Sequence, residues 1–160
     1  MIVKDEAVNL PRCLDSVQDC VDERGIVDTG SQDDTVAIAQ DRGAIVESIT
    51  WTQDFAAARN ISLTKATGDW ILVLDADETL TAAGQALLQQ LRSTETLGST
   101  AAQSVLAVNL LRYEVNADQA PYSEVSRLFR NRSDIYFERP YHETIDDSVA
   151  RLMQAEPQWQ

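Results

Sequence analysis

An apolar run that ends abruptly in acidic residues is the feature that most constrains this fold. Residues 70–74 read Trp-Ile-Leu-Val-Leu and carry no charge, so they have the length and branching of a strand buried on both faces. Asp75, Asp77 and Glu78 follow at once. Ligands of open α/β sheets bind beyond the carboxyl ends of the strands, where an Asp-x-Asp pair can hold a hard cation such as Mg²⁺. Taken alone, the pattern fits a strand followed by a solvated acidic turn equally well.

The segments on either side of this strand alternate between strand and helix patterns. Before it, the sequence predicts strands at residues 1–3, 25–28 and 44–49, and helices after Asn9, from Asp33 or Asp34 to Gly43, and over residues 55–66. After it, the sequence predicts a helix from Thr81, a connection at 93–103, strands at 105–111, 125–129 and 135–137, a turn at 118–121 and a last helix from Ser148. The early strand–helix–strand order favours a parallel sheet with right-handed crossovers.

Composition and charge place the chain among ordinary globular proteins. Its length suffices for one domain, expected at residues 1–160, and the short first strand and uncapped last helix suggest that this domain is incomplete at both ends. A net charge of −13 argues against nucleic acid as a partner. No apolar run approaches the roughly 20 residues of a membrane span, and the start turns acidic too early for a signal peptide, so we expect a cytoplasmic location. Two cysteines and one histidine do not make a zinc pattern.

Two of the expected strands end in acids that would share one crevice. Asp28 ends the second strand, and Asp75 and Asp77 end the fourth. If these strands are parallel neighbours, one acid can accept hydrogen bonds from a base or ribose, while the other two hold a cation that bridges a diphosphate. The chain contains no Gly-x4-Gly-Lys phosphate loop. The pattern therefore predicts a nucleotide site without that loop.

Several motifs, taken in order, resemble glycosyltransferase family 2, whose members have the GT-A fold. They are MIVKDE with Asn9-Leu10 at the start, VDTGSQDDT at 27–35, Trp51 with DFAAARN at 54–60, and GDWILVLDADE at 68–78. RLFR at 127–130 and YHE at 141–143 extend the likeness more loosely. The resemblance implies an α/β fold of the GT-A type, a Rossmann-like three-layer α/β/α arrangement with a mainly parallel central sheet.

The same resemblance implies an activity. An enzyme of this kind moves a sugar from a nucleotide-diphosphate donor to an acceptor hydroxyl with inversion, assisted by Mg²⁺ or Mn²⁺ at Asp75-Ala76-Asp77. The expected donor is a UDP-, GDP- or dTDP-sugar, and the acceptor is an unidentified saccharide, lipid-linked or protein group. Such an enzyme would serve cell-envelope or polysaccharide biosynthesis, in the cytoplasm or peripherally at the inner face of the membrane, and it could form a homodimer.

Residue roles follow from the resemblance by position. On the donor side, it places the backbone of Val3, Lys4 and Glu6 beside the nucleotide and assigns Asp28 as the acid that contacts the base. It assigns Arg59 as a basic residue near the diphosphate and Asp75 as the acid that contacts the ribose. On the other side, it assigns Asp77 as a metal ligand, His142 as a metal ligand or diphosphate contact, and Glu143 as the general base. A carboxylate placed across the sugar from the leaving group suits an inverting displacement.

Several of these roles have a plainer alternative. Arg59 could pair with Asp54 or another nearby acid, and a lone histidine such as His142 is more often structural than catalytic. Asp33 and Asp34 suit helix caps better than ligand binding.

Two other functions remain open from the sequence. Asp75-Ala76-Asp77-Glu78-Thr79 fits the Asp-x-Asp-x-Thr motif of haloacid dehalogenase-like phosphatases, in which Asp75 would be the nucleophile. Against that interpretation, about 70 residues precede the motif and no lysine follows Lys65. The second alternative is a truncated domain that binds a nucleotide without turnover.

Overall fold

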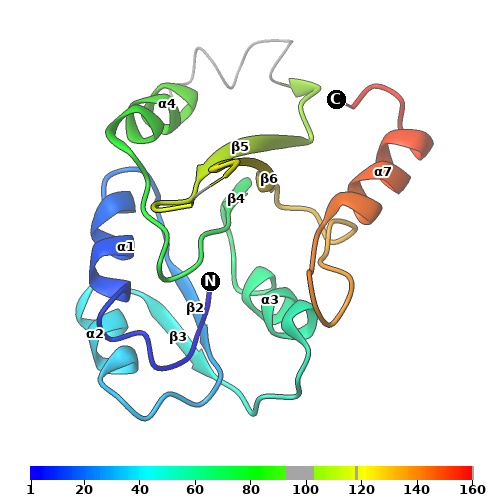
Figure 1. The fold of residues 1–160 in the computed structure, drawn as a ribbon. Coiled ribbons are helices and arrows are strands. Elements are labelled where there is room, and N and C mark those ends of the chain that lie inside the picture. The colour runs from blue at the N-terminus through cyan, green and yellow to red at the C-terminus, as the bar shows by residue number, and fades with distance from the viewer. Residues whose placement is uncertain (93–102, 118, 160) are drawn as a thin grey trace.

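Two three-stranded sheets form the centre of the molecule, one parallel and one antiparallel (Figure 1). The structure is a computed structural model that describes residues 1–92, 103–117 and 119–159. The predicted connection at 93–103 and turn at 118–121 therefore lie wholly or partly outside the described residues. No helix in the described ranges is long and apolar enough to cross a membrane.

The first part of the chain forms the parallel sheet. Its order is β1 (Ile2–Val3), β2 (Gly25–Asp28), β3 (Ile45–Ser48), with Val3 opposite Asp28 and Asp28 opposite Ser48. Helices α1 (Leu10–Val17) and α2 (Thr35–Asp41) pack on one face of this sheet, and α3 (Phe55–Leu63) lies on the other face (Figure 1). The strand–helix–strand order predicted from the sequence is confirmed.

Local sequence features explain these helices. The buried side chains of α1, which include Leu10 and Leu14, recur at helical spacing, and Pro11 is tolerated because it lies in the first turn. Gly43 follows α2 with a φ of +72°, a backbone conformation that glycine adopts without a steric penalty. Asp54 caps α3, because its carboxylate accepts a hydrogen bond from the Ala57 N–H at 2.9 Å.

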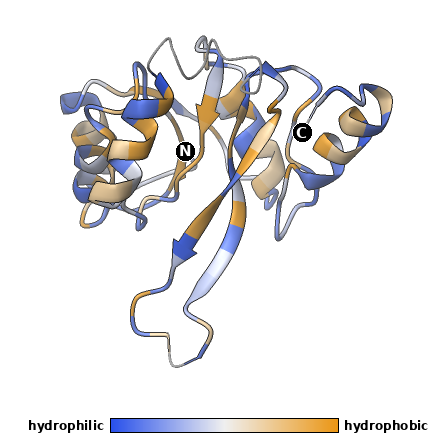
Figure 2. Cartoon of the chain, turned by 90° about the horizontal axis from the view of Figure 1, so that it is seen from above, coloured by the Kyte–Doolittle hydropathy of each residue, from blue (hydrophilic) through white to orange (hydrophobic). Residues whose placement is uncertain are grey.

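The second sheet is antiparallel and built around a long hairpin. Its order is β4 (Trp70–Leu72), β6 (Tyr122–Arg130), β5 (Ala107–Tyr113), and the β5–β6 hairpin projects well beyond the rest of the molecule (Figure 2). Helices α4 (Ala82–Arg92) and α7 (Asp146–Ala155) flank this part of the fold. Its core brings together side chains from several segments: Ala56, Val73, Leu106, Phe129, Ile135, Phe137, Ile145 and Leu152.

Two expectations about strands are wrong. Residues 70–74 do not form a strand buried on both faces: β4 covers Trp70–Leu72, and all three residues are half-buried, because within the described ranges β4 pairs with β6 alone. Residues 135–137 do not form a strand either. The side-chain amide of Asn60 bonds both the N–H and the C=O of Phe137, and so satisfies backbone groups that a neighbouring strand would otherwise pair.

Candidate active site

The Asp-x-Asp motif lies in the turn that follows β4, between the cores of the two sheets. Val73 is buried in the core of the antiparallel sheet, and its N–H donates to the Arg127 carbonyl at 2.8 Å. Ala76, three residues later, is buried in the core of the parallel sheet. The thiol of Cys13 on α1 donates to the Asp75 carbonyl at 3.4 Å. Contacts from both sheets and from α1 therefore fix the backbone of this turn.

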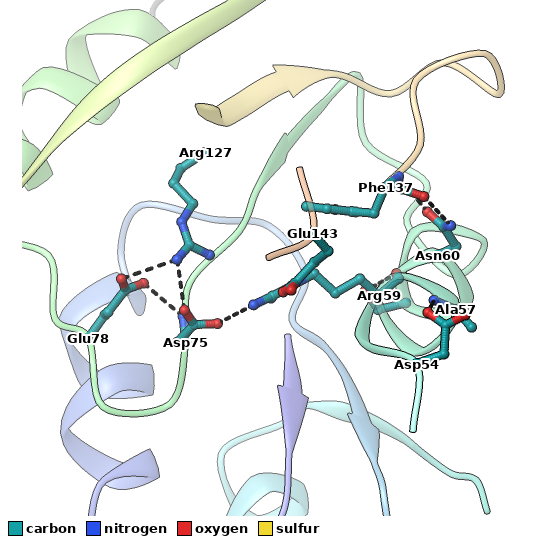
Figure 3. Close-up of polar contacts among 10 residues, drawn as sticks. Asp54, Ala57, Arg59, Asn60, Asp75, Glu78, Arg127, Phe137 and Glu143 are labelled. Atoms are coloured by element: carbon teal, nitrogen blue, oxygen red, sulfur yellow. Dashed lines mark hydrogen bonds and ion pairs between the residues drawn. The ribbon is translucent and has the colours of Figure 1, made fainter. Parts of the chain in front are cut away.

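Two arginines hold the carboxylate of Asp75 (Figure 3). Arg59 Nη2 lies 2.6 Å from Oδ1, and Arg127 Nη2 lies 2.7 Å from Oδ2. Burial alone would raise the pKa of this carboxyl, but the two guanidinium groups outweigh burial and lower it to about 2. Asp75 is therefore ionised at neutral pH, with each oxygen accepting a charge-assisted hydrogen bond.

Arg59 joins Asp75 to the proposed general base. This arginine lies on α3 and is 6% exposed, and its Nε donates to Glu143 Oε1 at 2.5 Å (Figure 3). Although burial lowers the pKa of Arg59, the carboxylates of Asp75 and Glu143 raise it above its ordinary value. Its Nη1 is buried and has no hydrogen-bond partner in the part of the chain that the structure describes. Asp54, the alternative partner considered from the sequence, instead caps α3. Arg59 forms its ion pairs with Asp75 and Glu143, which are distant in the sequence.

Asp77 and Glu78 differ sharply in their surroundings. Glu78 is partly buried, and its carboxylate accepts the Asp75 N–H at 2.9 Å and lies 3.3 Å from Arg127 Nη2. Asp77 is exposed. Its backbone carbonyl accepts from Arg12 Nη2 at 3.1 Å, whereas its carboxylate has no hydrogen bond or ion pair among the residues that the structure describes. The Asp77 carboxylate is therefore the acid of this turn that remains open to a ligand.

The predicted donor-side residues of the parallel sheet lie in the loops after β1 and β2, and hydrogen bonds connect these two segments. Asp28 is 3% exposed, and its carboxylate accepts the N–H groups of Gly30 and Ser31 at 3.2 and 3.1 Å. The Val3 carbonyl accepts from the Thr29 N–H at 3.0 Å. These bonds bring the predicted base-contacting acid next to the first strand, while its carboxylate is engaged by its own loop.

Lys4 and Glu6 continue the first of these loops. The Glu6 N–H donates to Thr35 Oγ1 at 2.7 Å, and its carboxylate accepts from Asn9 Nδ2 at 2.9 Å. Lys4 is exposed at the surface. The Glu6 backbone is thus anchored to the start of α2.

The predicted metal site is not assembled as a cluster. Over residues 1–92, 103–117 and 119–159, no three His, Cys, Asp or Glu side chains are grouped to hold a metal ion. His142 is exposed, with a φ of +54°. The exposed carboxylate of Asp77 nevertheless fits Mg²⁺, which commonly binds one or two carboxylates together with substrate phosphates and water.

The sequence did not reveal the part played by Arg127 or by Glu78. Arg127 belongs to β6, and its contact with Asp75 spans 52 positions in the chain. The only available signal was its place in the loosely matching RLFR segment, which does not specify a partner.

Comparison with known proteins gives consistent results. The profile of Glycosyl transferase family 2 matches residues 1–158. A TPR repeat-containing protein of Synechococcus elongatus is 54% identical over 160 residues, which cover 99% of this chain and 38% of that protein. An uncharacterized glycosyltransferase of Rickettsia felis is 31% identical over 150 residues, which cover 93% of this chain and 52% of that protein. The chain thus spans between 38% and about half of the length of these curated relatives.

Solved structures share the fold at low sequence identity. Glucosyl-3-phosphoglycerate synthase from Mycobacterium tuberculosis in complex with UDP superimposes with a TM-score of 0.68 at 17% identity, covering 98% of this chain and 65% of that one. Residues 1–349 of S. aureus TarS in complex with UDP give a TM-score of 0.56 at 18% identity, covering 86% of this chain and 48% of that one. The predicted α/β fold of the GT-A type is confirmed, although three of its strands pair in an antiparallel sheet. Because the family profile covers almost the whole chain, this protein belongs to glycosyl transferase family 2.

Proposed function

We propose that this chain binds a nucleotide-diphosphate sugar and transfers the sugar to an acceptor hydroxyl with inversion. The observation that carries the proposal is the ion-pair cluster at the end of β4, where Arg59 contacts both Asp75 and Glu143. Three separate segments of the chain meet there, and they combine an anion-binding cation with two carboxylates. Family membership supports the same class of reaction.

The residues present suit each part of that reaction. Asp75 would orient the ribose, and Arg59 would bind the diphosphate, since its guanidinium places positive charge directly beside Asp75. Glu143 would accept the proton of the acceptor hydroxyl while that oxygen forms a bond to the anomeric carbon and the bond to the diphosphate breaks. The nucleoside diphosphate then leaves with the electron pair of the broken bond.

Asp77 is the proposed ligand of Mg²⁺ or Mn²⁺, with His142 as a further candidate. When bound, such an ion would neutralise charge on the departing diphosphate. The exposed Asp77 carboxylate supports this assignment. Arg59 and Arg127 supply positive charge at the same turn, next to Asp75.

The phosphatase alternative is not favoured. In such a phosphatase an oxygen of Asp75 would attack phosphorus, but here two arginine ion pairs stabilise the carboxylate and so weaken it as a nucleophile. The family match points to a different reaction class.

The donor and acceptor are further parts of the proposal. UDP is the best first probe, because two structures that share this fold contain UDP. The acceptor is a saccharide, lipid-linked or protein hydroxyl, and a cytoplasmic role in envelope or polysaccharide assembly fits that chemistry.

Calorimetric titration with UDP, GDP and dTDP, each with and without Mn²⁺, tests the proposal. We expect one nucleotide to bind more tightly than the others, and Mn²⁺ to strengthen its binding. Absence of binding by all three would remove the transferase proposal for this chain. Binding without sugar transfer from the matching nucleotide sugar would instead favour a nucleotide-binding domain without turnover.

A further inference from the structure

Arg127 contacts the Asp-x-Asp turn through both its main chain and its side chain. Its carbonyl accepts the Val73 N–H at 2.8 Å. Its Nη2 lies 2.7 Å from Asp75 Oδ2 and 3.3 Å from Glu78 Oε1, and its side chain is 13% exposed (Figure 3). A single residue of β6 therefore holds the strand end that leads into the motif and the first acid of the motif itself.

Glu78 completes a closed set of contacts around Asp75. One carboxylate oxygen of Glu78 accepts the Asp75 N–H at 2.9 Å, and the other faces Arg127. The backbone and the carboxylate of Asp75 are thus both fixed, the first by Glu78 and the second by the two arginines. Charge-assisted hydrogen bonds of this kind are shorter and stronger than neutral ones.

We propose that Arg127 is a positioning residue for nucleotide-sugar binding, which acts by orienting the Asp75 carboxylate and is itself held in place by Glu78. This inference rests on the proposed function, because it assigns the donor to Asp75. It differs from the role proposed for Arg59, which is to bind the donor diphosphate itself. Arg127 works on the nucleotide only through Asp75.

The neighbouring arginine of the same strand shows that this placement is specific. The guanidinium of Arg130 lies over the ring of Trp70, 4.3 Å from its centroid, and Nε donates to the Val105 carbonyl at 3.2 Å. Arg130 therefore packs on the sheet, whereas Arg127 faces the acids of the turn. Both acids accept from one nitrogen of Arg127, Nη2, so a lysine at 127 keeps the charge and could reproduce part of these contacts on its flexible stem.

A double-mutant cycle measures the proposed coupling. The probe is UDP with Mn²⁺, and the affinities are measured by calorimetry for Arg127→Gln, Asp75→Asn and the double variant. We expect Arg127→Gln to weaken UDP binding about tenfold in the parent background and to cost almost nothing further in the Asp75→Asn background, since residues that act as a unit are not additive. Arg112→Gln on β5, which removes an arginine paired with the exposed Glu114, is the matched control and should bind as the parent does.

A second cycle does not depend on measurable binding by Asp75→Asn. We expect Glu78→Gln to weaken UDP binding in the same direction by a smaller factor, and Arg127→Gln with Glu78→Gln to be no weaker than Arg127→Gln alone. Arg127→Lys should bind UDP more tightly than Arg127→Gln but less tightly than the parent. If Arg127→Gln does not unfold cooperatively on heating, Arg127→Lys takes its place in both cycles.

The outcomes separate this inference from the proposed function. If the parent protein binds none of the nucleotides, the proposed function falls and the inference with it. If the parent binds UDP and the Arg127 variants bind it equally well, the inference alone is overturned. A loss on Arg127→Gln that persists in full beside Asp75→Asn or Glu78→Gln would show that Arg127 contacts the nucleotide directly, which also overturns it.

Discussion

The guanidinium of Arg59 lies 2.5 Å from the carboxylate of Glu143, so a helix and a loop 84 residues further along the chain meet inside the candidate active site. The same arginine contacts Asp75. The donor side of the proposed reaction and its general base therefore share one cation. A ligand that binds to Arg59 would therefore change the electrostatic surroundings of Glu143 as well.

Removing Arg59 should destabilise the fold. Arg59→Gln leaves the carboxylates of Asp75 and Glu143 without their common partner in a largely buried site, and breaking a fully buried ion pair costs about 3–5 kcal/mol. Because Asp75 is partly exposed, we expect a smaller loss of roughly 2 kcal/mol. Urea unfolding followed by circular dichroism measures it.

Arg151→Gln is the matched control for that experiment. Arg151 pairs with Glu138 at the surface, and exposed pairs contribute about 0–1 kcal/mol. Equal losses for the two variants would contradict the structural importance assigned to Arg59.

Glu143→Gln should separate chemistry from binding. The glutamine keeps the shape of the side chain but cannot take a proton from the acceptor hydroxyl, so we expect kcat for sugar transfer to fall by a factor on the order of 10²–10⁴. UDP affinity should change far less than kcat, because among the described residues Glu143 reaches the donor side through Arg59.

Glu124→Gln provides the control, since Glu124 is exposed on β6 and its substitution removes the same charge. Nearly normal transfer by Glu143→Gln would assign the general base to another residue. A large loss of UDP affinity with unchanged kcat would place Glu143 on the donor side instead.

Much of this fold could be predicted because its signals are local. The apolar face of α1, the cap at Asp54 and the glycine after α2 each depend on residues within a few positions of one another. The half-burial of β4 could not be predicted, because it depends on which strands pair with it and not on its own sequence.

The candidate site was predicted in its parts but not in its connections. Asp75, Arg59 and Glu143 do meet, but the sequence assigned them to separate roles and did not predict that one arginine joins them. Arg127 reaches Asp75 because the register of β6 against β4 pairs Leu128 with Leu72. Such a register is set by long-range pairing, which a single sequence does not display.

Asp77 should account for any dependence of donor binding on a divalent cation. Its carboxylate is exposed, whereas that of Asp75 is held by two arginines, so Asp77→Asn should reduce UDP affinity in Mn²⁺ to the value measured in EDTA. Titration of parent and variant with UDP, each in Mn²⁺ and in EDTA, gives the comparison.

Asp69→Asn is the control for Asp77→Asn, because Asp69 is exposed just before β4 and carries the same charge. It should retain the full effect of Mn²⁺. An unchanged Mn²⁺ effect in Asp77→Asn would assign the cation to other ligands, with His142 the next to be substituted.

The low pKa of Asp75 predicts how the stability of this site depends on pH. Burial opposes ionisation, but Arg59 and Arg127 lower the pKa from 3.8 to about 2 in the folded protein. A carboxyl with a depressed folded-state pKa stabilises the fold fully above its unfolded pKa and loses that contribution as pH falls through the folded value. The stability difference between the parent and Asp75→Asn should therefore be constant from pH 7 to about 5 and shrink steadily between about pH 4 and 2. Urea unfolding of both proteins at each pH provides this difference. The contributions of the other carboxylates to the pH dependence largely cancel, because both proteins contain them. A difference that stays flat down to pH 2.5 would show that the two arginines do not stabilise the ionised carboxylate, and would remove the electrostatic basis for its orientation.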